Sequence, residues 1–140
     1  MVLDLYSRAV ISWAMGTWLT GELAQHALTM APTDWKPTTG LLHHSDRGSQ
    51  YAARRYQRLL SAHGITNSMS RTGNCWDNAC VESFFGTLTR ALVYHRHYAT
   101  RDEAKQHIFE YVEVFYTRRR RHSTLDYDSS AEFKARTAVA

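Results

Sequence analysis

Residues 40–70 read GLLHHSDRGSQYAARRYQRLLSAHGITNSMS and indicate the class of fold. Gly40–Ser45 predicts a short strand that ends at Asp46. Ser49–His63 predicts a helix, because apolar side chains recur at helical spacing. Its expected buried face consists of Ala52, Tyr56, Leu59 and Leu60. Ile65–Ser70 predicts another strand, so this stretch is typical of an α/β unit, in which sites lie at the carboxyl ends of strands.

The residues before this stretch predict a hairpin followed by a helix. Val2–Tyr6 and Ala9–Met15 are β-prone runs that are split near Ser7, as in a hairpin. Thr20 is the expected N-cap of a helix that Pro32 ends. The chain is therefore expected to begin inside a sheet.

The second half of the chain predicts two helices. The first has Asp77 as N-cap, with Trp76 packed against it as a hydrophobic staple. Its expected apolar face is Val81, Phe84, Phe85, Leu88 and Leu92. Glu82 lies on another face and projects away from the core. The second helix opens with the capping box Thr100–Glu103 and ends in the run Arg118–Arg121. Its expected inward residues are Ala104, Ile108, Tyr111, Val112 and Phe115.

Composition indicates one globular domain that covers residues 1–140, because 44% of the residues are hydrophobic and 12% are aromatic. The formal charge is +4, and the excess is most visible in Arg118–Arg121, which favours a polyanionic partner. No secretory leader and no run of about 18 apolar residues is present, so we expect a cytoplasmic protein without membrane contact. Cys75 and Cys80 lack zinc-site spacing and are interpreted as free thiols.

Two carboxylates form the best candidate site. Asp46 and Glu82 are separated by 35 residues, and each lies in a stretch rich in polar and turn-forming residues. Carboxylates from distant segments can hold Mg²⁺ or Mn²⁺, because hard cations prefer oxygen ligands. The alternative is that Asp46 caps the helix that follows it, while Glu82 is a solvated helix residue.

Long motifs around both carboxylates resemble a known family. The matching stretches are Asp46–Tyr51, Ser70–Ala79 and Glu82–Phe85, together with Val2–Arg8 and Phe115–Ser123. They closely resemble bacterial insertion-sequence transposases that are encoded in two reading frames. The resemblance is to the protein of the second frame. That family belongs to the retroviral-integrase superfamily, so the resemblance implies an RNase H-like mixed sheet flanked by helices and a triad of Asp, Asp and Glu. The implied activity is DNA transposition by metal-dependent hydrolysis and strand transfer.

The resemblance assigns roles to individual residues. Asp46 matches the second member of the triad and Glu82 the third, and together they would hold Mg²⁺ or Mn²⁺ in a two-ion site. The family's first aspartate lies on the central strand, which would fall before Met1, so we expect a chain that lacks its first strand and is inactive alone. Asp4 is the other candidate, but a carboxylate capping the turn at Ser7 is the favoured interpretation.

The resemblance also implies DNA contacts at the transposon end and on the target. The expected residues are Arg47, Arg71, Asn74, Asn78, Arg90, Arg118, Arg119, Arg120 and Arg121. The alternative for Arg118–Arg121 is a solvated helix end, where cations favour the helix dipole. Tyr116 is interpreted as packing, or as a ring that stacks on a base. Partners would be DNA and either further copies of the chain or an intact transposase subunit, at the bacterial nucleoid.

Two other functions stay open at this point. The first is a non-catalytic DNA-binding or assembly fragment that pairs with an intact transposase, whose DNA binding would survive alanine at Asp46 and Glu82. The second is a nuclease of the RNase H type, which would cleave RNA in a hybrid with DNA.

Overall fold

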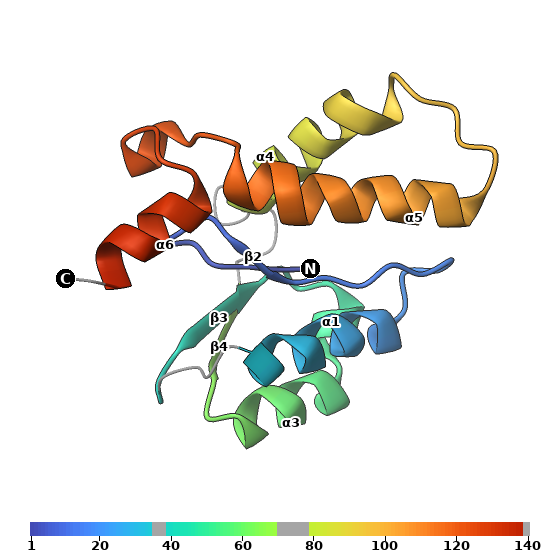
Figure 1. Ribbon diagram of the computed structural model, residues 1–140. Helices are drawn as coiled ribbons and strands as arrows, with labels where there is room; N and C mark the ends of the chain where they lie inside the picture. The colour runs from blue at the N-terminus through green and yellow to red at the C-terminus, as the bar shows by residue number, and fades with distance from the viewer. Residues whose placement is uncertain (35–38, 70–78, 139–140) are drawn as a thin grey trace. The chain divides into compact units, whose positions relative to one another are not determined.

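The computed structural model describes residues 1–34, 39–69 and 79–138 (Figure 1). Its residues group into two compact units. The sheet unit contains Met1–Val2 and Ile11–Ala79, and the helical unit contains Leu3–Val10 and Cys80–Ala140. The predicted N-cap Asp77 and staple Trp76 lie outside the described residues.

The N-terminal hairpin is present but shorter than predicted. β1 (Val2–Leu3) pairs with β2 (Val10–Ser12) in a two-stranded sheet. The first strand stops early because the carboxylate of Asp4 accepts hydrogen bonds from the backbone N–H of Tyr6 and of Ser7, both at 3.2 Å. The Ser7 hydroxyl donates to the same carboxylate. Asp4 is therefore a turn cap, as favoured above.

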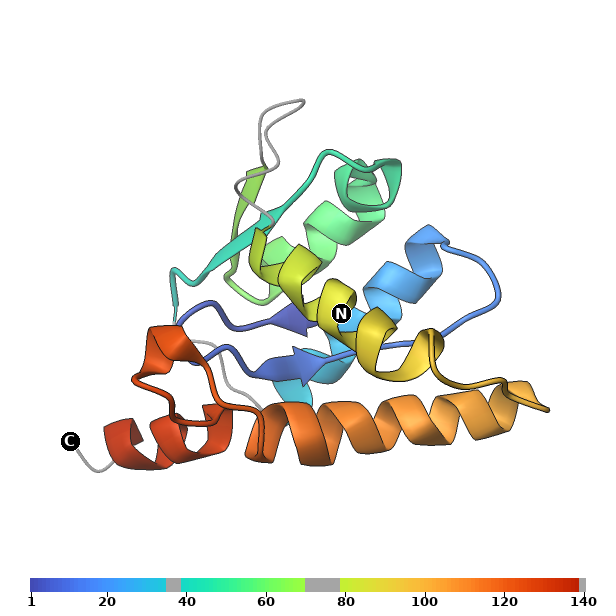
Figure 2. The same ribbon diagram turned by 90° about the horizontal axis from the view of Figure 1, so that it is seen from above.

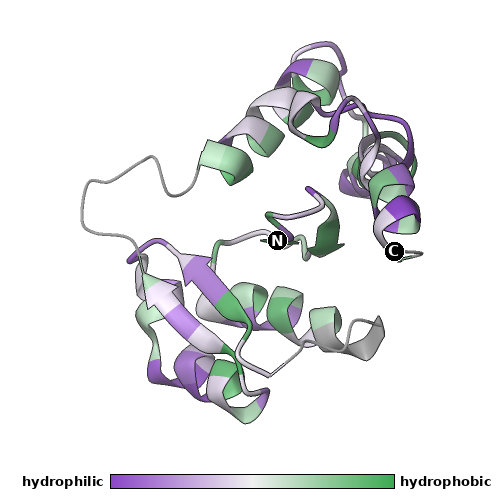
Figure 3. Ribbon diagram, turned by 90° about the vertical axis from the view of Figure 1, so that its left-hand side faces the viewer, coloured by the Kyte–Doolittle hydropathy of each residue, from purple (hydrophilic) through white to green (hydrophobic). Residues whose placement is uncertain are grey.

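A strand–helix–strand segment forms the sheet unit, as predicted. β3 (Leu42–Ser45) and β4 (Thr66–Met69) are parallel, and α2 (Ser49–Ala52) and α3 (Arg54–Ala62) connect them (Figure 1). Both strands are largely hydrophilic, with the sequences LHHS and TNSM (Figure 3). Side-chain hydrogen bonds, as well as apolar contacts, therefore hold the two strands in place.

The prediction of one continuous helix at 49–63 was wrong. Ala53 is extended, with φ −59° and ψ 134°, and it separates α2 from α3. The amide of Gln57 donates to the carbonyl of Tyr51 at 2.7 Å and occupies an acceptor that a continuous helix would use. Because of this break, Ala52 is exposed instead of buried. Gly64, with φ +67°, ends the helical segment.

The core of the sheet unit is formed by Leu28, Tyr56, Leu60 and Ile65. Leu28 belongs to α1 (Gly21–Asp34), which lies against α2 and α3. The hydroxyl of Thr20 accepts from Leu23 N–H at 3.2 Å, which confirms the predicted N-cap. The predicted end at Pro32 was wrong, because α1 continues to Asp34. A proline removes one backbone hydrogen bond and crowds the carbonyl four residues earlier, but near the end of a helix this does not stop the chain from continuing for two more helical residues.

The helical unit begins with α4 (Ala79–Leu88), which continues as the π-helical segment η2 (Thr89–Val93). Phe84 and Leu92 are buried, as predicted. Phe85 was predicted to face inward but is 48% exposed. The ring of Phe84 packs edge-on against Tyr116, with 4.7 Å between centroids, and this contact sets the rotation of α4 about its axis.

The long second helix consists of α5 (Arg101–Glu110) and the π-helical segment η3 (Tyr111–Tyr116) (Figure 2). The Thr100 hydroxyl accepts from Glu103 N–H at 3.2 Å, and the Glu103 carboxylate accepts from Ala99 N–H at 2.9 Å. The capping box therefore forms, with its return bond one residue earlier than expected. Phe115 is 44% exposed while Tyr116 is 4% exposed, because a π-turn adds one residue and shifts the inward face.

The sequence prediction missed the last helix, α6 (Ser130–Ala138), and the short 3₁₀ turn η4 (Ser123–Leu125) before it. Ser129 and Glu132 form a capping box for α6. The Ser129 hydroxyl accepts from Glu132 N–H at 3.3 Å, and the Glu132 carboxylate accepts from Ser129 N–H at 2.8 Å. The ring of Phe133 in α6 packs edge-on against Tyr6 of the hairpin, with 5.0 Å between centroids.

Candidate functional site

Asp46 lies directly after β3, at the carboxyl end of a parallel strand, as predicted. Its Oδ1 atom accepts a hydrogen bond from Gly48 N–H at 2.7 Å, and the side chain is exposed. The carboxylate therefore stabilises the turn into α2 and is presented to solvent at the same time. The interpretation as a local cap and the interpretation as a ligand are compatible for this residue.

Gly48 is a site residue that sequence reasoning missed. A Cβ atom at this position would lie 2.8 Å from Oδ1 of Asp46 and 2.9 Å from Oε1 of Gln50. Any side chain would thus push the carboxylate away from its present position. The signal in the sequence was the glycine two residues after the aspartate, within a turn that requires close approach.

Polar side chains of the two strands support the position of Asp46. Nε2 of His43 lies 3.1 Å from the hydroxyl of Tyr56, and Nδ1 of His44 lies 3.2 Å from the hydroxyl of Ser68. Burial lowers the pKa of His43. Burial, followed by the charge of Asp46, raises the pKa of Tyr51. Both histidines are half-buried and contact neighbouring hydroxyl groups, so both act as packing residues of the sheet unit.

Glu82 lies in the first turn of α4 and is exposed, in agreement with the prediction. Phe84 is buried two residues later, so the packing of α4 directs Glu82 outward. The guanidinium of Arg8 contacts the thiol of Cys80 in the same turn. Arg8 has a left-handed backbone, with φ 59°. The hairpin turn therefore supports the end of α4 that carries the glutamate, a contact that no local pattern predicted.

The meeting of Asp46 and Glu82 at one metal ion stays a prediction, because the two residues belong to different units. Within residues 1–34, 39–69 and 79–138, no group of three or more His, Cys, Asp and Glu side chains is placed to hold a metal. The two exposed carboxylates nevertheless fit a hard divalent cation by their chemistry. Asp4 does not add to this pair, since both of its oxygens accept hydrogen bonds in the hairpin turn.

The predicted DNA-binding residues have different environments. Arg71, Asn74 and Asn78 lie outside the described residues. Arg47, Arg90, Arg118, Arg119 and Arg121 are exposed. Arg120 is half-buried, and its guanidinium carbon lies 5.6 Å from the centre of the Tyr116 ring. Tyr116 itself is buried, so the expectation that its ring could stack on a base does not fit its position.

Carboxylates lie close to the end of the arginine run. Hydrogen bonds from the backbone and hydroxyl of Ser129, followed by the charge of Arg121, lower the pKa of Glu132. Arg136 forms an ion pair with Asp128, with 2.9 Å between Nη2 and Oδ2. Arg121 thus lies near a carboxylate, whereas Asp128 is paired with Arg136 and not with the run.

The sequence matches protein-family models over most of its length. Residues 1–75 match one model of the integrase core domain, and residues 63–129 match a second model with the same description. The chain belongs to the integrase core family. This membership implies an RNase H-like fold, in agreement with the α/β pattern of the sheet unit.

The relatives come from bacterial insertion sequences. The chain is 48% identical to an uncharacterized 31 kDa protein of insertion element IS600 from Shigella sonnei, over 94% of this chain and 48% of the relative. It is 42% identical to the transposase for IS904 from Lactococcus lactis, over 94% of the chain and 52% of the relative. It is 44% identical to the transposase InsF for IS3A from Escherichia coli, over 88% of the chain and 43% of the relative. The resemblance to insertion-sequence transposases is thus confirmed, and the chain spans about half the length of these relatives.

In the part of the chain that the structure describes, no helix is both long and apolar enough to cross a bilayer.

Proposed function

We propose that this chain is a catalytic-core segment of a DNA transposase that acts by hydrolysis at a transposon end and then by strand transfer into target DNA. The observation that carries the proposal is the pair of exposed carboxylates, Asp46 and Glu82, within a sequence of the integrase core family. Asp46 follows a parallel strand, where α/β proteins place their sites. Glu82 projects from a helix whose opposite side is packed.

The expected cofactor is Mg²⁺ or Mn²⁺ in a two-ion site. Such a metal pair stabilises the attacking and leaving oxygens of an in-line displacement at phosphorus. Asp46 and Glu82 would hold it through their carboxylate oxygens. The hydrogen bond from Gly48 N–H to Asp46 fixes one of these ligands before metal binds. Preorganisation of this kind lowers the cost of assembling the site.

The proposed partners are transposon-end and target DNA, together with further copies of the chain or another transposase subunit. Exposed Arg47, Arg90, Arg118, Arg119 and Arg121 would neutralise backbone phosphates. The half-buried Arg120 would act mainly through its ring contact with Tyr116. Because the proposed partners are DNA, the expected cellular location is the bacterial nucleoid.

The test is end cleavage by the protein made from the complete reading frame that contains residues 1–140. Labelled duplexes that carry the transposon end are incubated with Mn²⁺ and wild-type protein, Asp46→Asn or Glu82→Gln. We expect nicking at the end by the wild type and loss of nicking in both variants. Nicking that persists in either variant would contradict the assigned carboxylate roles.

The same preparation separates the two other functions. A nuclease of the RNase H type would cleave an RNA–DNA hybrid faster than the transposon end. A non-catalytic assembly fragment would bind DNA without cleaving it, and it would bind equally well after Asp46→Ala and Glu82→Ala. Neither outcome is expected, because neither hypothesis accounts for transposase relatives and two exposed carboxylates together.

A further inference from the structure

Positive charge is concentrated in a stretch that the arginine run does not include. Residues 47–76 contain five arginines and no aspartate or glutamate. These arginines are Arg47, Arg54, Arg55, Arg58 and Arg71. The stretch therefore carries a formal charge of +5, against +4 for the whole chain, and all other residues together carry −1. The sequence-based emphasis on Arg118–Arg121 overlooked this balance, because acidic residues surround that run.

Three of the five arginines lie on α3. Arg54, Arg55 and Arg58 are all exposed. Among the residues that the structure describes, none of the three takes part in an ion pair. We call these three side chains the α3 basic face.

The α3 basic face opposes the stability of its own helix. Arg54 and Arg55 occupy the first two positions of α3, where the positive end of the helix dipole disfavours cations. Arg54 and Arg58 are four residues apart, and like charges at this spacing repel each other. The first turn of α3 contains no acidic residue that would offset these repulsions, whereas in α5 Asp102 pairs with Lys105. An anionic partner would relieve both repulsions on α3.

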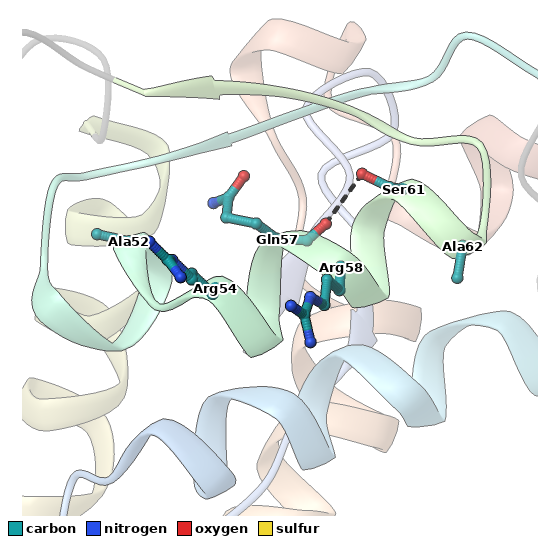
Figure 4. Close-up of a pocket in the computed structure, with 6 residues that line it drawn as sticks. All are labelled: Ala52, Arg54, Gln57, Arg58, Ser61 and Ala62. Carbon is teal, nitrogen blue, oxygen red and sulfur yellow. Dashed lines mark hydrogen bonds between the residues drawn. The ribbon is translucent and has the colours of Figure 1, made fainter.

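The side chains around the α3 basic face form a shallow hollow (Figure 4). Its lining consists of Ala52, Arg54, Gln57, Arg58, Ser61 and Ala62. Gln57 is held in place, since its amide donates to Tyr51 and its oxygen accepts from Asn67 at 2.9 Å. The Ser61 hydroxyl donates to the Gln57 carbonyl at 3.1 Å, as the dashed line shows (Figure 4). Small alanines at both ends leave the arginines accessible.

The spacing of the arginines suits a nucleic-acid backbone. Arg54 and Arg58 lie about one helical turn apart, with a rise of about 6 Å between them, so both guanidinium groups can contact the same phosphate backbone. Arginine also binds phosphate oxygens through two parallel N–H donors. The hollow contains no large apolar side chain that would insert into a lipid surface.

We propose that the α3 basic face binds the sugar–phosphate backbone of duplex DNA as a contact separate from the arginine run. Its ligands are phosphates, so it holds DNA without reading sequence. This inference rests on the proposed function, because it requires that the protein works on DNA.

The experiment measures binding of the full chain to a fluorescein-labelled duplex of arbitrary sequence at several KCl concentrations. The variant Arg54→Gln with Arg58→Gln removes two charges from α3. The matched control, Arg101→Gln with Lys105→Gln, removes two charges from exposed positions of α5. Circular dichroism checks that all proteins fold. The charge-preserving variant Arg54→Lys with Arg58→Lys tests whether charge alone is sufficient.

We expect the α3 variant to lower the slope of log K against log salt by about 0.9 for each phosphate that it no longer neutralises, and the α5 control to keep the wild-type slope. The variant Arg54→Lys with Arg58→Lys should retain most of the wild-type slope. DNA binding by the wild type with an unchanged slope in the α3 variant would overturn this inference alone. An equal loss in the α5 control would also overturn it, since net charge would then explain the effect. Absence of DNA binding by the wild type would overturn the proposed function as well.

Discussion

The two units use arginine in opposite ways. In the helical unit, Arg120 lies over the ring of Tyr116 and Arg121 acts on Glu132, so part of the arginine run serves the fold. In the sheet unit, Arg54 and Arg58 have no ion-pair partner among the described residues, although their helix would be more stable without them. A dense run of arginines in sequence is therefore not by itself a sign of a binding surface, because one of its members packs within the fold.

The two carboxylates also differ in what holds each of them in position. Asp46 is held by a hydrogen bond from Gly48 N–H, so its position depends on a turn of three residues. Glu82 depends on the rotation of a whole helix, which the contact between Phe84 and Tyr116 sets. Damage to the first site should be local, whereas damage to the second should follow from any loss of packing in the helical unit.

The largest expected effect is on the packing that directs Glu82. Phe84→Ala should lower the free energy of unfolding by about 3–5 kcal/mol, because it leaves a cavity beside Tyr116. The adjacent Phe85→Ala is the control, and it should cost far less because Phe85 is 48% exposed. Urea unfolding measures both. Equal losses would mean that α4 packs through a different face.

The next effect concerns the turn that holds Asp46. Gly48→Ala places a methyl group 2.8 Å from Oδ1 and displaces the ligand. We expect Mn²⁺ affinity to fall about 10–100-fold, as for other groups that orient a metal ligand. Gly86→Ala is the matched control, since its nearest neighbour would be the tip of Arg90 at 3.9 Å. Electron paramagnetic resonance of free Mn²⁺ measures the Mn²⁺ affinity of both variants. A loss of affinity in Gly86→Ala but not in Gly48→Ala would contradict the role assigned to Gly48.

A smaller effect separates the members of the arginine run. Arg120→Gln removes the cation from the Tyr116 ring and should cost about 0.5–2 kcal/mol of stability. It should leave the salt dependence of DNA binding nearly unchanged. Arg119→Gln should leave stability nearly unchanged and should lower the slope of log K against log salt by about 0.9. Thermal unfolding and salt titration test the pair, and a common effect of both substitutions would show that Arg120 also binds a phosphate.

The smallest effect is on pH dependence in the sheet unit. Burial lowers the pKa of His43, so the unfolded chain binds this proton more tightly than the folded chain does. Its contribution to stability is complete above about pH 6.5 and is lost as the pH falls below that value. His43→Gln should therefore flatten the dependence of the urea midpoint between about pH 7.5 and 5.5. His63→Gln, at an exposed position, should leave it as in the wild type.

Local signals in the sequence predicted much of the structure. The β-prone run before Asp46 and the helical spacing after it predicted the strand–helix–strand segment correctly. The outward position of Glu82 followed from the apolar face of α4. Each of these features depends on residues within a few turns of one another, and such patterns are visible without a tertiary structure.

The remaining features depend on contacts that local patterns do not contain. The break at Ala53 arises because the Gln57 amide takes the carbonyl of Tyr51. The contact between Arg8 and Cys80 joins residues that are 72 positions apart. The helix α6 was different, since the capping box Ser129–Glu132 was visible in the sequence and was overlooked. The meeting of Asp46 and Glu82 at one metal ion would also depend on long-range contacts, and it stays a prediction.

The π-helical segment Tyr111–Tyr116 gives the helical unit an unusual tolerance of a change in chain length. Each residue of an ordinary α-helix turns the chain by about 100°. The wide turn has absorbed one extra residue, so deletion of Glu113 or Val114 would restore the ordinary geometry and keep Tyr116 in its present place. Arg120 and Phe84 would then keep their contacts with the Tyr116 ring. A single-codon loss at this point would thus spare the support of Glu82, whereas the same loss within α5 would rotate everything that follows.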